Sequence, residues 1–223
     1  MPMTEAGRKG NAGGAVEGPA ARRRLLQFAR EPVPGQVKTR LQPALEAAGA
    51  CELHIALLTH TARQLAAVPR CERELWVAGD PGHPALRHAA SLGRARVRRQ
   101  RGTDLGERMH HALDMALADA QRVVLVGSDC PGLDAAYVEA AFAALAAADV
   151  VLGPALDEGY VLIGVRRVDA RLFREVDWGT GAVLAQTLAR VDALGWRAAL
   201  LEPRRDIDRP EDLAAWEEAS GGC

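Results

Sequence analysis

Short runs of aliphatic and β-branched residues alternate along this chain with longer segments whose apolar residues recur at helical spacing. The short runs lie at residues 24–29, 74–79, 95–100, 122–127, 149–155, 160–165 and 197–201. The helical segments lie at 49–68, 84–91, 104–120, 134–147, 180–194 and 210–219. This alternation predicts a single α/β domain with a mostly parallel central sheet and helices on both faces. Such sheets bind ligands at the carboxyl ends of their strands, so functional residues are expected in the loops that follow strands.

One pair of predicted strands departs from this pattern. The runs at 149–155 and 160–165 are separated by too few residues for a helical crossover. Parallel neighbours need such a crossover, so the sheet is expected to lose its parallel order locally at this pair.

The 223 residues are enough for one well-buried α/β core, which we expect to cover residues 24–219. Residues 1–23 are rich in Gly, Ala and charge and lack the apolar stretch of a signal peptide. They are expected to form a flexible leader.

Composition argues against several classes of partner. The 28 basic and 29 acidic side chains nearly cancel, so neither nucleic acid nor a membrane surface is an expected partner. The apolar stretches end well short of the ~20 residues that a membrane span needs. The four cysteines are widely spaced and form no CxxC pair, so neither disulfides nor structural zinc are expected. We therefore predict a cytoplasmic protein, and its oligomeric state is left open.

The segment RVVLVGSDCPGL places Asp129 directly after a predicted strand, at the mouth of the sheet. Mg²⁺ prefers oxygen ligands and commonly binds one or two carboxylates together with substrate phosphates. Asp129 is therefore a candidate metal ligand; the alternative is that its side chain only caps the following turn. Ser128 and Cys130 could act as nucleophiles, but the GxSxG spacing is absent, and this interpretation is disfavoured.

A second segment, FAREPVPGQVKTRLQP, forms a loop after the first predicted strand and contains Gly35, Lys38 and Arg40. Arginine offers a planar fork to phosphate oxygens and lysine a point charge, so the two cations could bind a polyphosphate. The segment is neither a P-loop nor a dinucleotide-binding turn. From the residues alone, a solvated charged surface is an equally good interpretation.

The third segment, RRDIDRPEDL, places Asp206 and Asp208 ahead of Pro210. Asp208 and Glu211 have the spacing of a capping box, and proline suits a helix start. Capping and a second metal carboxylate are equally supported here.

Two weaker segments contribute substrate-contact candidates. In GTDLGERM, Asp104 precedes Glu107 at capping distance, so capping is favoured over substrate contact. In GPALDEGYVLIG, Asp157 and Glu158 lie in a turn between strands, where they contact a substrate or remain in solvent. Trp178 is interpreted as core packing.

Taken in order, FAREPVPGQVKTRL, QRGTDLGERM, GSDCPGL, GPALDEGYVLIG, WGTG and DIDRPEDL resemble the radical-SAM/selenodomain-associated transferase family of GT-A-like proteins over residues 24–217. Members of that family are described as glycosyltransferases, with a proposed link to arsenosugar biosynthesis. They share the nucleotide-diphosphosugar-transferase fold. The KTRL and DIDRPEDL segments are also similar to those of 2-phospho-L-lactate and molybdenum-cofactor guanylyltransferases.

The resemblance implies roles for particular residues. It makes Asp129 and Asp208 the metal-side acids and assigns Lys38 and Arg40 to the nucleotide phosphates, with Asp129 and Lys38 as the catalytic residues. Gly35, Asp104, Asp157 and Glu158 are the further substrate-binding candidates. The chain departs from the family where DGGY becomes DEGY at residues 157–160 and where Arg209 replaces a threonine. The first departure lies near the expected acceptor.

The leading hypothesis is a glycosyltransferase that uses Mg²⁺ or Mn²⁺, a nucleotide-diphosphate-sugar donor and a small-molecule acceptor. Electrostatic stabilisation of the leaving diphosphate would be its main catalytic device. The first alternative is a nucleotidyltransferase that releases pyrophosphate from a triphosphate. The second is a non-catalytic nucleotide-binding module, which the joint presence of both acids and both cations disfavours.

Overall fold

The structure is a computed structural model that describes residues 22–221. It contains one seven-stranded sheet, and most of the leader predicted at residues 1–23 lies outside the described residues. The strands are β1 (Arg23–Arg30), β2 (Glu72–Ala78), β3 (Arg96–Arg99), β4 (Arg122–Val126), β5 (Val150–Pro154), β6 (Tyr160–Val165) and β7 (Ala198–Leu200). Their order across the sheet is β3-β2-β1-β4-β6-β5-β7.

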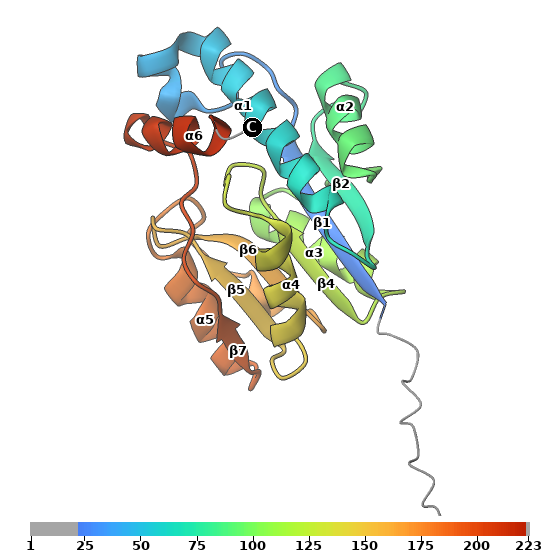
Figure 1. Cartoon of the computed structure of the whole chain (residues 1–223). Coiled ribbons are helices and arrows are strands. Elements are labelled where there is room, and N and C mark those ends of the chain that lie inside the picture. Colours follow the sequence, from blue (N-terminus) through green and yellow to red (C-terminus); the bar gives the residue numbers. More distant parts are fainter. Residues whose placement is uncertain (1–21, 222–223) are drawn as a thin grey trace, which may run out of the picture.

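The described residues form six helices, and helices lie on both faces of the sheet, which confirms the predicted fold class (Figure 1). They are α1 (Gln42–Ala66), α2 (Pro84–Gly93), α3 (Leu105–Leu117), α4 (Ala135–Ala144), α5 (Val183–Ala193) and α6 (Leu213–Ser220). Short 3₁₀ turns precede α1 and α6 and follow β6. Figure 1 shows α4 in front of the sheet and α3 behind it.

Residues of β1 alternate between the two cores because successive strand side chains point to opposite faces. Leu25 packs with α4 and the end of α1, and Ala29 packs with α1 and α2. Leu26 and Phe28 lie on the other face with α3. Both cores are continuous with buried residues of β4, β5 and β6, so the sheet is rigid beneath its loops.

The predicted local loss of parallel order is confirmed at β6, which pairs antiparallel with both β4 and β5. The turn between β5 and β6 is too short for a crossover, so β6 must run back along its neighbour. All other strand pairs are parallel.

The first helix begins earlier than the apolar spacing indicated. It starts at Gln42 rather than near residue 49, with Pro43 in its first turn, where the missing N–H costs no hydrogen bond. Glu46 has φ 56° and ψ 174°, which breaks the helix into two parts. The predicted span corresponds to the second, buried part.

The chain order creates a crevice between β1 and β4. From β1 the chain adds β2 and β3 on one side and then returns to place β4 on the other side of β1. Ligands of open α/β sheets bind at such a reversal, beyond the carboxyl ends of the two strands. The loops at residues 31–41 and 127–134 leave the sheet here.

The segment between β7 and α6 also reaches this crevice. It continues along the edge of β5, where Leu201 N donates to Leu152 O (2.9 Å) and Arg204 N donates to Pro154 O (2.9 Å). It then crosses the carboxyl end of the sheet to α6, which lies beside α1 in Figure 1. Ile207, from this segment, is fully buried with Leu41, Leu53 and Leu57.

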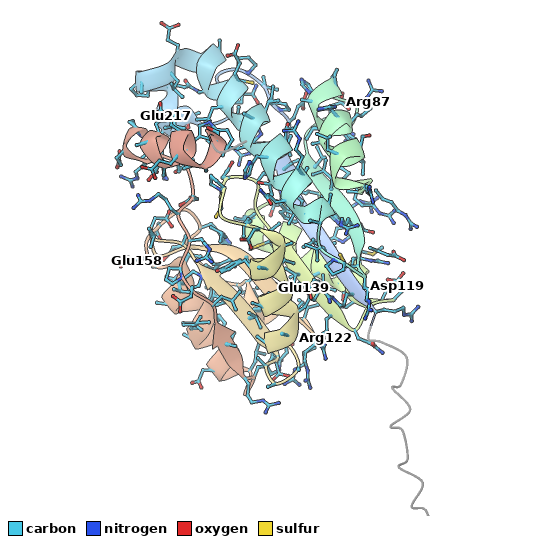
Figure 2. All side chains as sticks on the ribbon, viewed as in Figure 1. Arg87, Asp119, Arg122, Glu139, Glu158 and Glu217 are labelled. Carbon is cyan, nitrogen blue, oxygen red and sulfur yellow. The ribbon has the colours of Figure 1, made fainter. Side chains whose placement is uncertain are left out.

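At the opposite end of the sheet, ion pairs link β1 to neighbouring elements. Arg23 pairs with Glu139, and Arg24 lies 2.7 Å from Asp119 and 3.0 Å from Glu72. Figure 2 shows Asp119, Arg122 and Glu139 at this end. Within residues 22–221, no helix combines the length and the apolar content that a membrane crossing needs.

Candidate functional site

A cavity of about 600 Å³ lies over the carboxyl ends of β1 and β4. Four cations line it, namely Arg30, Lys38, Arg40 and Arg108, together with the carboxylates of Asp104, Asp129 and Asp208. The site therefore forms at the reversal in strand order, where the fold favours ligand binding.

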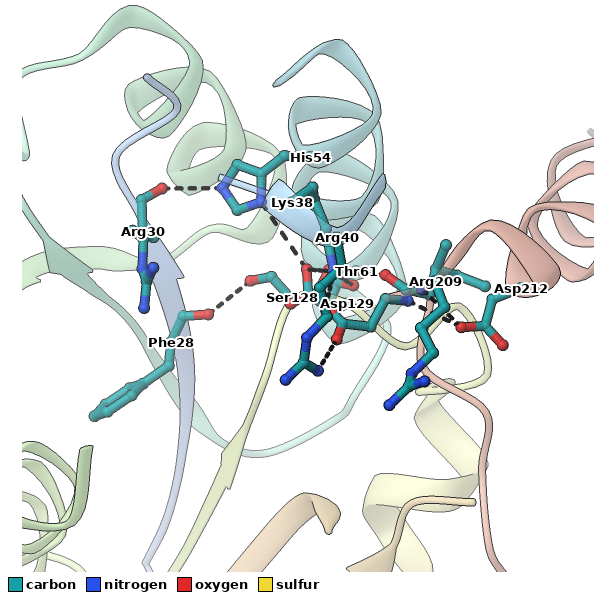
Figure 3. A network of polar contacts seen from close by, with 12 residues as sticks. Phe28, Arg30, Lys38, Arg40, His54, Thr61, Ser128, Asp129, Arg209 and Asp212 are labelled. Atoms are coloured by element: carbon teal, nitrogen blue, oxygen red, sulfur yellow. Dashed lines mark hydrogen bonds and ion pairs between the residues drawn. The ribbon is translucent and has the colours of Figure 1, made fainter. Parts of the chain in front are cut away.

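Lys38 is buried in the wall of this cavity rather than solvated. Its side chain is 3% exposed, and its Nζ donates to Ile207 O at 2.6 Å. The same ammonium lies 3.0 Å from Asp129 Oδ1 and 3.9 Å from Asp208 Oδ1. The two acids that were predicted to share a cation thus face one buried lysine. Figure 3 shows Lys38 beside Asp129.

Ile207 brings the two acids together through its main chain. Ile207 N donates to Asp129 O at 2.8 Å, which fixes the segment carrying Asp208 against the loop after β4. Its carbonyl oxygen holds Lys38, and its side chain is fully buried. One hydrophobic residue therefore positions three charged neighbours.

Arg40 completes the charge balance. Its guanidinium donates to Asp208 Oδ2 at 2.6 Å, and its side chain is 51% exposed. Two cations and two carboxylates therefore neutralise each other. The solvated-surface interpretation does not describe the buried Lys38, whereas Arg40 is half exposed, and phosphate binding by either cation stays a prediction.

Asp208 does not cap the last helix. The capping carboxylate is that of Asp212, which accepts the N–H groups of Asp208 (3.2 Å) and Arg209 (2.9 Å). The capping-box interpretation of Asp208 is thus wrong, because the carboxylate four residues later takes that role. The carboxylate of Asp208 is directed to the cations instead.

The carboxylate oxygens of Asp129 and Asp208 provide part of the ligand set that a divalent cation needs. Asp129 Oδ1 is buried and has no hydrogen-bond donor, because Lys38 approaches it outside hydrogen-bonding geometry. Within the described residues, no group of three or more His, Cys, Asp or Glu side chains could hold an ion. Two carboxylates with phosphate oxygens from a substrate suit Mg²⁺. The pair therefore fits a cation that shares its coordination with a ligand.

His54 is a member of the site that the sequence analysis missed. Its ring, 6% exposed, lies between Arg30 O, 3.1 Å from Nε2, and Asp129 Oδ1, 3.9 Å from Nδ1. It comes from the buried face of α1, where the helical spacing indicated only packing. Its sole signal is a histidine among apolar residues.

Ser128 and Cys130 have structural surroundings. Ser128 Oγ donates to Phe28 O at 2.7 Å and accepts from Gln27 Nε2 at 3.0 Å, which ties the end of β4 to β1. Burial raises the pKa of the Cys130 thiol to about 12, so it stays protonated. Neither group is prepared to act as a nucleophile.

A second cavity of about 410 Å³ adjoins the first. The two share Phe28, Arg40, Leu105, Gly127, Asp129 and Asp208 as walls. Asp157 and Asp206 line the second cavity and not the first. Trp178 packs against the core, as expected, and also lines this cavity.

The remaining candidates are more peripheral. Asp104 lines the first cavity, but its carboxylate caps α3 by accepting Glu107 N at 2.8 Å. Gly35, with φ 83°, supplies a left-handed turn before Lys38 and does not line either cavity. Glu158 is exposed at the periphery of the molecule and is likewise absent from both linings (Figure 2).

Residues 61–180 match the DUF2064 family, described as an uncharacterized protein conserved in bacteria. The chain belongs to this family. A protein from Desulfovibrio desulfuricans G20, described as a candidate nucleotide-diphospho-sugar transferase, is 30% identical with a TM-score of 0.80, over 90% of this chain and 88% of that chain. No curated protein sequence matches.

More distant structures share the fold. The 4-diphosphocytidyl-2C-methyl-D-erythritol synthase of Anaerococcus prevotii DSM 20548 is 10% identical with a TM-score of 0.60, over 90% of this chain and 96% of that chain. A nucleotidyl transferase from Methanothermobacter thermautotroptrophicus is 15% identical with a TM-score of 0.57, over 92% of this chain and all of that chain. The DUF2064 chain thus has the fold of proteins described as nucleotidyl and sugar transferases.

Proposed function

We propose that this DUF2064 protein is a divalent-metal-dependent glycosyltransferase that uses a nucleotide-diphosphate-sugar donor and a small-molecule acceptor. The observation that carries the proposal is the paired set of Asp129, Asp208, Lys38 and Arg40 between two adjoining cavities. The name of the relative from Desulfovibrio desulfuricans G20 supports the donor class. The catalytic domain would be residues 24–219.

The charge balance indicates how a diphosphate would be bound. In the free protein Lys38 and Arg40 are paired with Asp129 and Asp208, so a polyphosphate that took these two cations would leave the two carboxylates without counter-charge. Bound Mg²⁺ or Mn²⁺ would supply that counter-charge and stabilise charge on the leaving diphosphate. Asp129 and Asp208 would hold it, and Lys38 and Arg40 would then be released from the carboxylates to contact phosphate oxygens.

The cations therefore have two partners in turn. In the free protein Lys38 and Arg40 compensate the partly exposed carboxylates of Asp129 and Asp208, which reduces like-charge repulsion within the site. In the loaded protein they would hold the donor and stabilise its departing charge. The hydrogen bond to Ile207 O holds the ammonium of Lys38 in the wall of the first cavity, within reach of the two carboxylates.

A nucleotidyltransferase is the second candidate. It is favoured by the fold shared with nucleotidyl and cytidylyltransferases and by the KTRL and DIDRPEDL segments. We place glycosyl transfer first because the relative at 30% identity is described as a nucleotide-diphospho-sugar transferase. The wider resemblance to the radical-SAM/selenodomain-associated transferases supports the same order.

Product analysis tests the two candidates against each other. Glycosyl transfer releases a nucleoside diphosphate from a nucleotide sugar, whereas nucleotidyl transfer releases pyrophosphate from a triphosphate. A panel of both donor types, with Mg²⁺ or Mn²⁺, is incubated with pooled small-molecule acceptors and analysed by mass spectrometry. Asp129→Asn should abolish turnover, while Asp114→Asn, at an exposed position on α3 outside both cavities, should not. Acceptor-dependent pyrophosphate release without turnover of any nucleotide sugar would reverse the order of the candidates.

A further inference from the structure

The second cavity has a strongly unequal charge. Among the described residues that line it, the acids are Asp129, Asp157, Asp206 and Asp208, and the only cation is Arg40. Arg40 is already paired with Asp208 at 2.6 Å. The first cavity, by contrast, has four cations in its lining.

Two acids of the second cavity, Asp157 and Asp206, form no ion pair with another described residue. The other two acids, Asp129 and Asp208, lie 3.0 Å and 3.9 Å from the ammonium of Lys38. The second cavity therefore carries negative charge, at Asp157 and Asp206, that no ion pair within the described residues neutralises.

The rest of the cavity is apolar. Its inner surface is formed by Phe28, Met109, Leu125, Ile163, Tyr160 and Trp178. The rings of Tyr160 and Trp178 meet edge to face, with centroids 6.4 Å apart. Aromatic surfaces of this kind pack well against the apolar face of a ring. A bound molecule would thus place an apolar side against this inner surface and polar groups against the acids.

We propose that the second cavity is an acceptor site for a molecule that carries hydroxyl or amino groups and no phosphate. Hydroxyl and ammonium groups donate hydrogen bonds to carboxylates, whereas a phosphate would meet two acids without an ion pair, Asp157 and Asp206, and one cation already paired with Asp208. The inference rests on the proposed function and specifies the acceptor class of the same site.

The reaction that follows is balanced for a hydroxyl acceptor. The acceptor oxygen forms a bond to the anomeric carbon of the donor sugar, and the bond from that carbon to the diphosphate oxygen breaks. The nucleoside diphosphate leaves with the electron pair, and the hydroxyl proton passes to solvent. Because the two cavities share Asp129, Asp208 and Arg40 in their linings, a donor in the first and an acceptor in the second would be neighbours.

The charge preference is measurable without knowing the acceptor, because Trp178 lies in the cavity wall. Fluorescence quenching by caesium and by iodide is compared in the full chain and in Trp178→Phe, and the difference isolates Trp178. The quenching constant for each ion is divided by the constant that the same ion gives with free N-acetyltryptophanamide. We expect caesium to quench Trp178 at least about twofold more effectively than iodide. Equal quenching, or stronger quenching by iodide, would overturn the proposal.

Charge reversal provides the matched control. Asp157→Lys should lower the caesium-to-iodide ratio of Trp178, whereas Asp114→Lys, exposed on α3 and outside both cavities, should leave it unchanged. Equal effects of the two variants would show a general surface field and contradict the proposal.

In turnover assays, glucosamine and glucosamine 6-phosphate serve as a matched acceptor pair. Turnover of the phosphorylated member alone would contradict the inference. Failure of every nucleotide sugar as donor would contradict the proposed function while the quenching ratio still decides the cavity's preference.

Discussion

At the scale of single residues, the proposed mechanism depends on charged groups that exchange one partner for another. Lys38 is buried against Ile207 O and faces both acids, so in the free protein it is a counter-ion to the carboxylates, and its contact with phosphate is part of the proposal. Glu158 shows a different adaptation. It has φ 68°, a left-handed conformation that glycine adopts without strain, at the position where the resembling family has glycine.

Replacing Lys38 with methionine should separate its two roles. Without the ammonium, Asp129 and Asp208 repel each other, so Mn²⁺ alone should bind about tenfold more tightly than in the parent protein. Nucleoside diphosphate binding should weaken at the same time, since a phosphate contact is lost. Titration calorimetry measures both.

The control for Lys38→Met is Arg108→Met. Arg108 lines the same cavity but donates to Gly102 O at 3.1 Å instead of facing the acid pair. Its replacement should leave the affinity for Mn²⁺ alone unchanged. If Lys38→Met also leaves that affinity unchanged, the counter-ion role is wrong.

At Glu158 the usual ranking of alanine and glycine should reverse. Glu158→Gly should be more stable than Glu158→Ala by about 1 kcal/mol, because only glycine relieves the left-handed conformation. Urea unfolding of the two variants measures the difference. At an exposed helical position such as Asp114, the alanine variant should instead be more stable to unfolding than the glycine variant.

At the scale of elements, the segment between β7 and α6 decides whether the site is complete. It is held along β5 by main-chain hydrogen bonds and against the β4 loop by Ile207, and it ends at the Asp212 cap. The strands and most helix positions were predictable, because apolar spacing reflects burial on one or two faces. The antiparallel β6 was predictable from loop length alone.

The candidate site was only partly predictable. Loops after strands indicated Asp129 and Lys38, since the fold class places such loops at the ligand edge. His54 and Asp206 were missed as site residues because their roles arise from neighbours distant in sequence. The choice between capping and cation binding at Asp208 depended on which carboxylate reaches the helix end, and spacing alone cannot decide between Asp208 and Asp212.

Removing the Asp212 cap should affect both stability and ligand binding. Asp212→Ala leaves two N–H groups without an acceptor and should cost about 0.5–2 kcal/mol of unfolding free energy. Nucleotide binding with Mg²⁺ should weaken as well, because the segment that carries Asp208 loses its support. Thermal melts and calorimetry measure these two effects. Asp134→Ala, which removes the α4 cap, should destabilise without changing nucleotide affinity.

At the scale of the whole molecule, the domain is a rigid sheet that carries two ion pairs, Lys38 with Asp129 and Arg40 with Asp208, at its carboxyl edge. The interior on both faces is apolar and continuous, so the parts that respond to ligands are the loops at the carboxyl edge. The two cavities share a wall, so the proposed donor and acceptor sites are coupled through the same residues.

Metal and nucleotide should therefore bind cooperatively. Each alone disturbs a neutral set of ion pairs, whereas the two together supply compensating charge. In thermal melts, Mg²⁺ alone and a nucleoside diphosphate alone should each give small shifts. Their combination should exceed the sum of the two shifts, with stabilisation approaching about 2.7 kcal/mol when ligand reaches 100 times its Kd. Additive shifts would contradict the exchange of partners.

The course of the chain through the site has a consequence for biosynthesis. Asp129 follows β4, but Asp208 comes after all seven strands in the sequence. A nascent chain that emerges from the ribosome amino-terminus first can therefore assemble most of the sheet while its cleft still lacks one carboxylate. The complete acid pair would form only when translation has passed the last strand, so a partly made chain would hold neither cation nor donor.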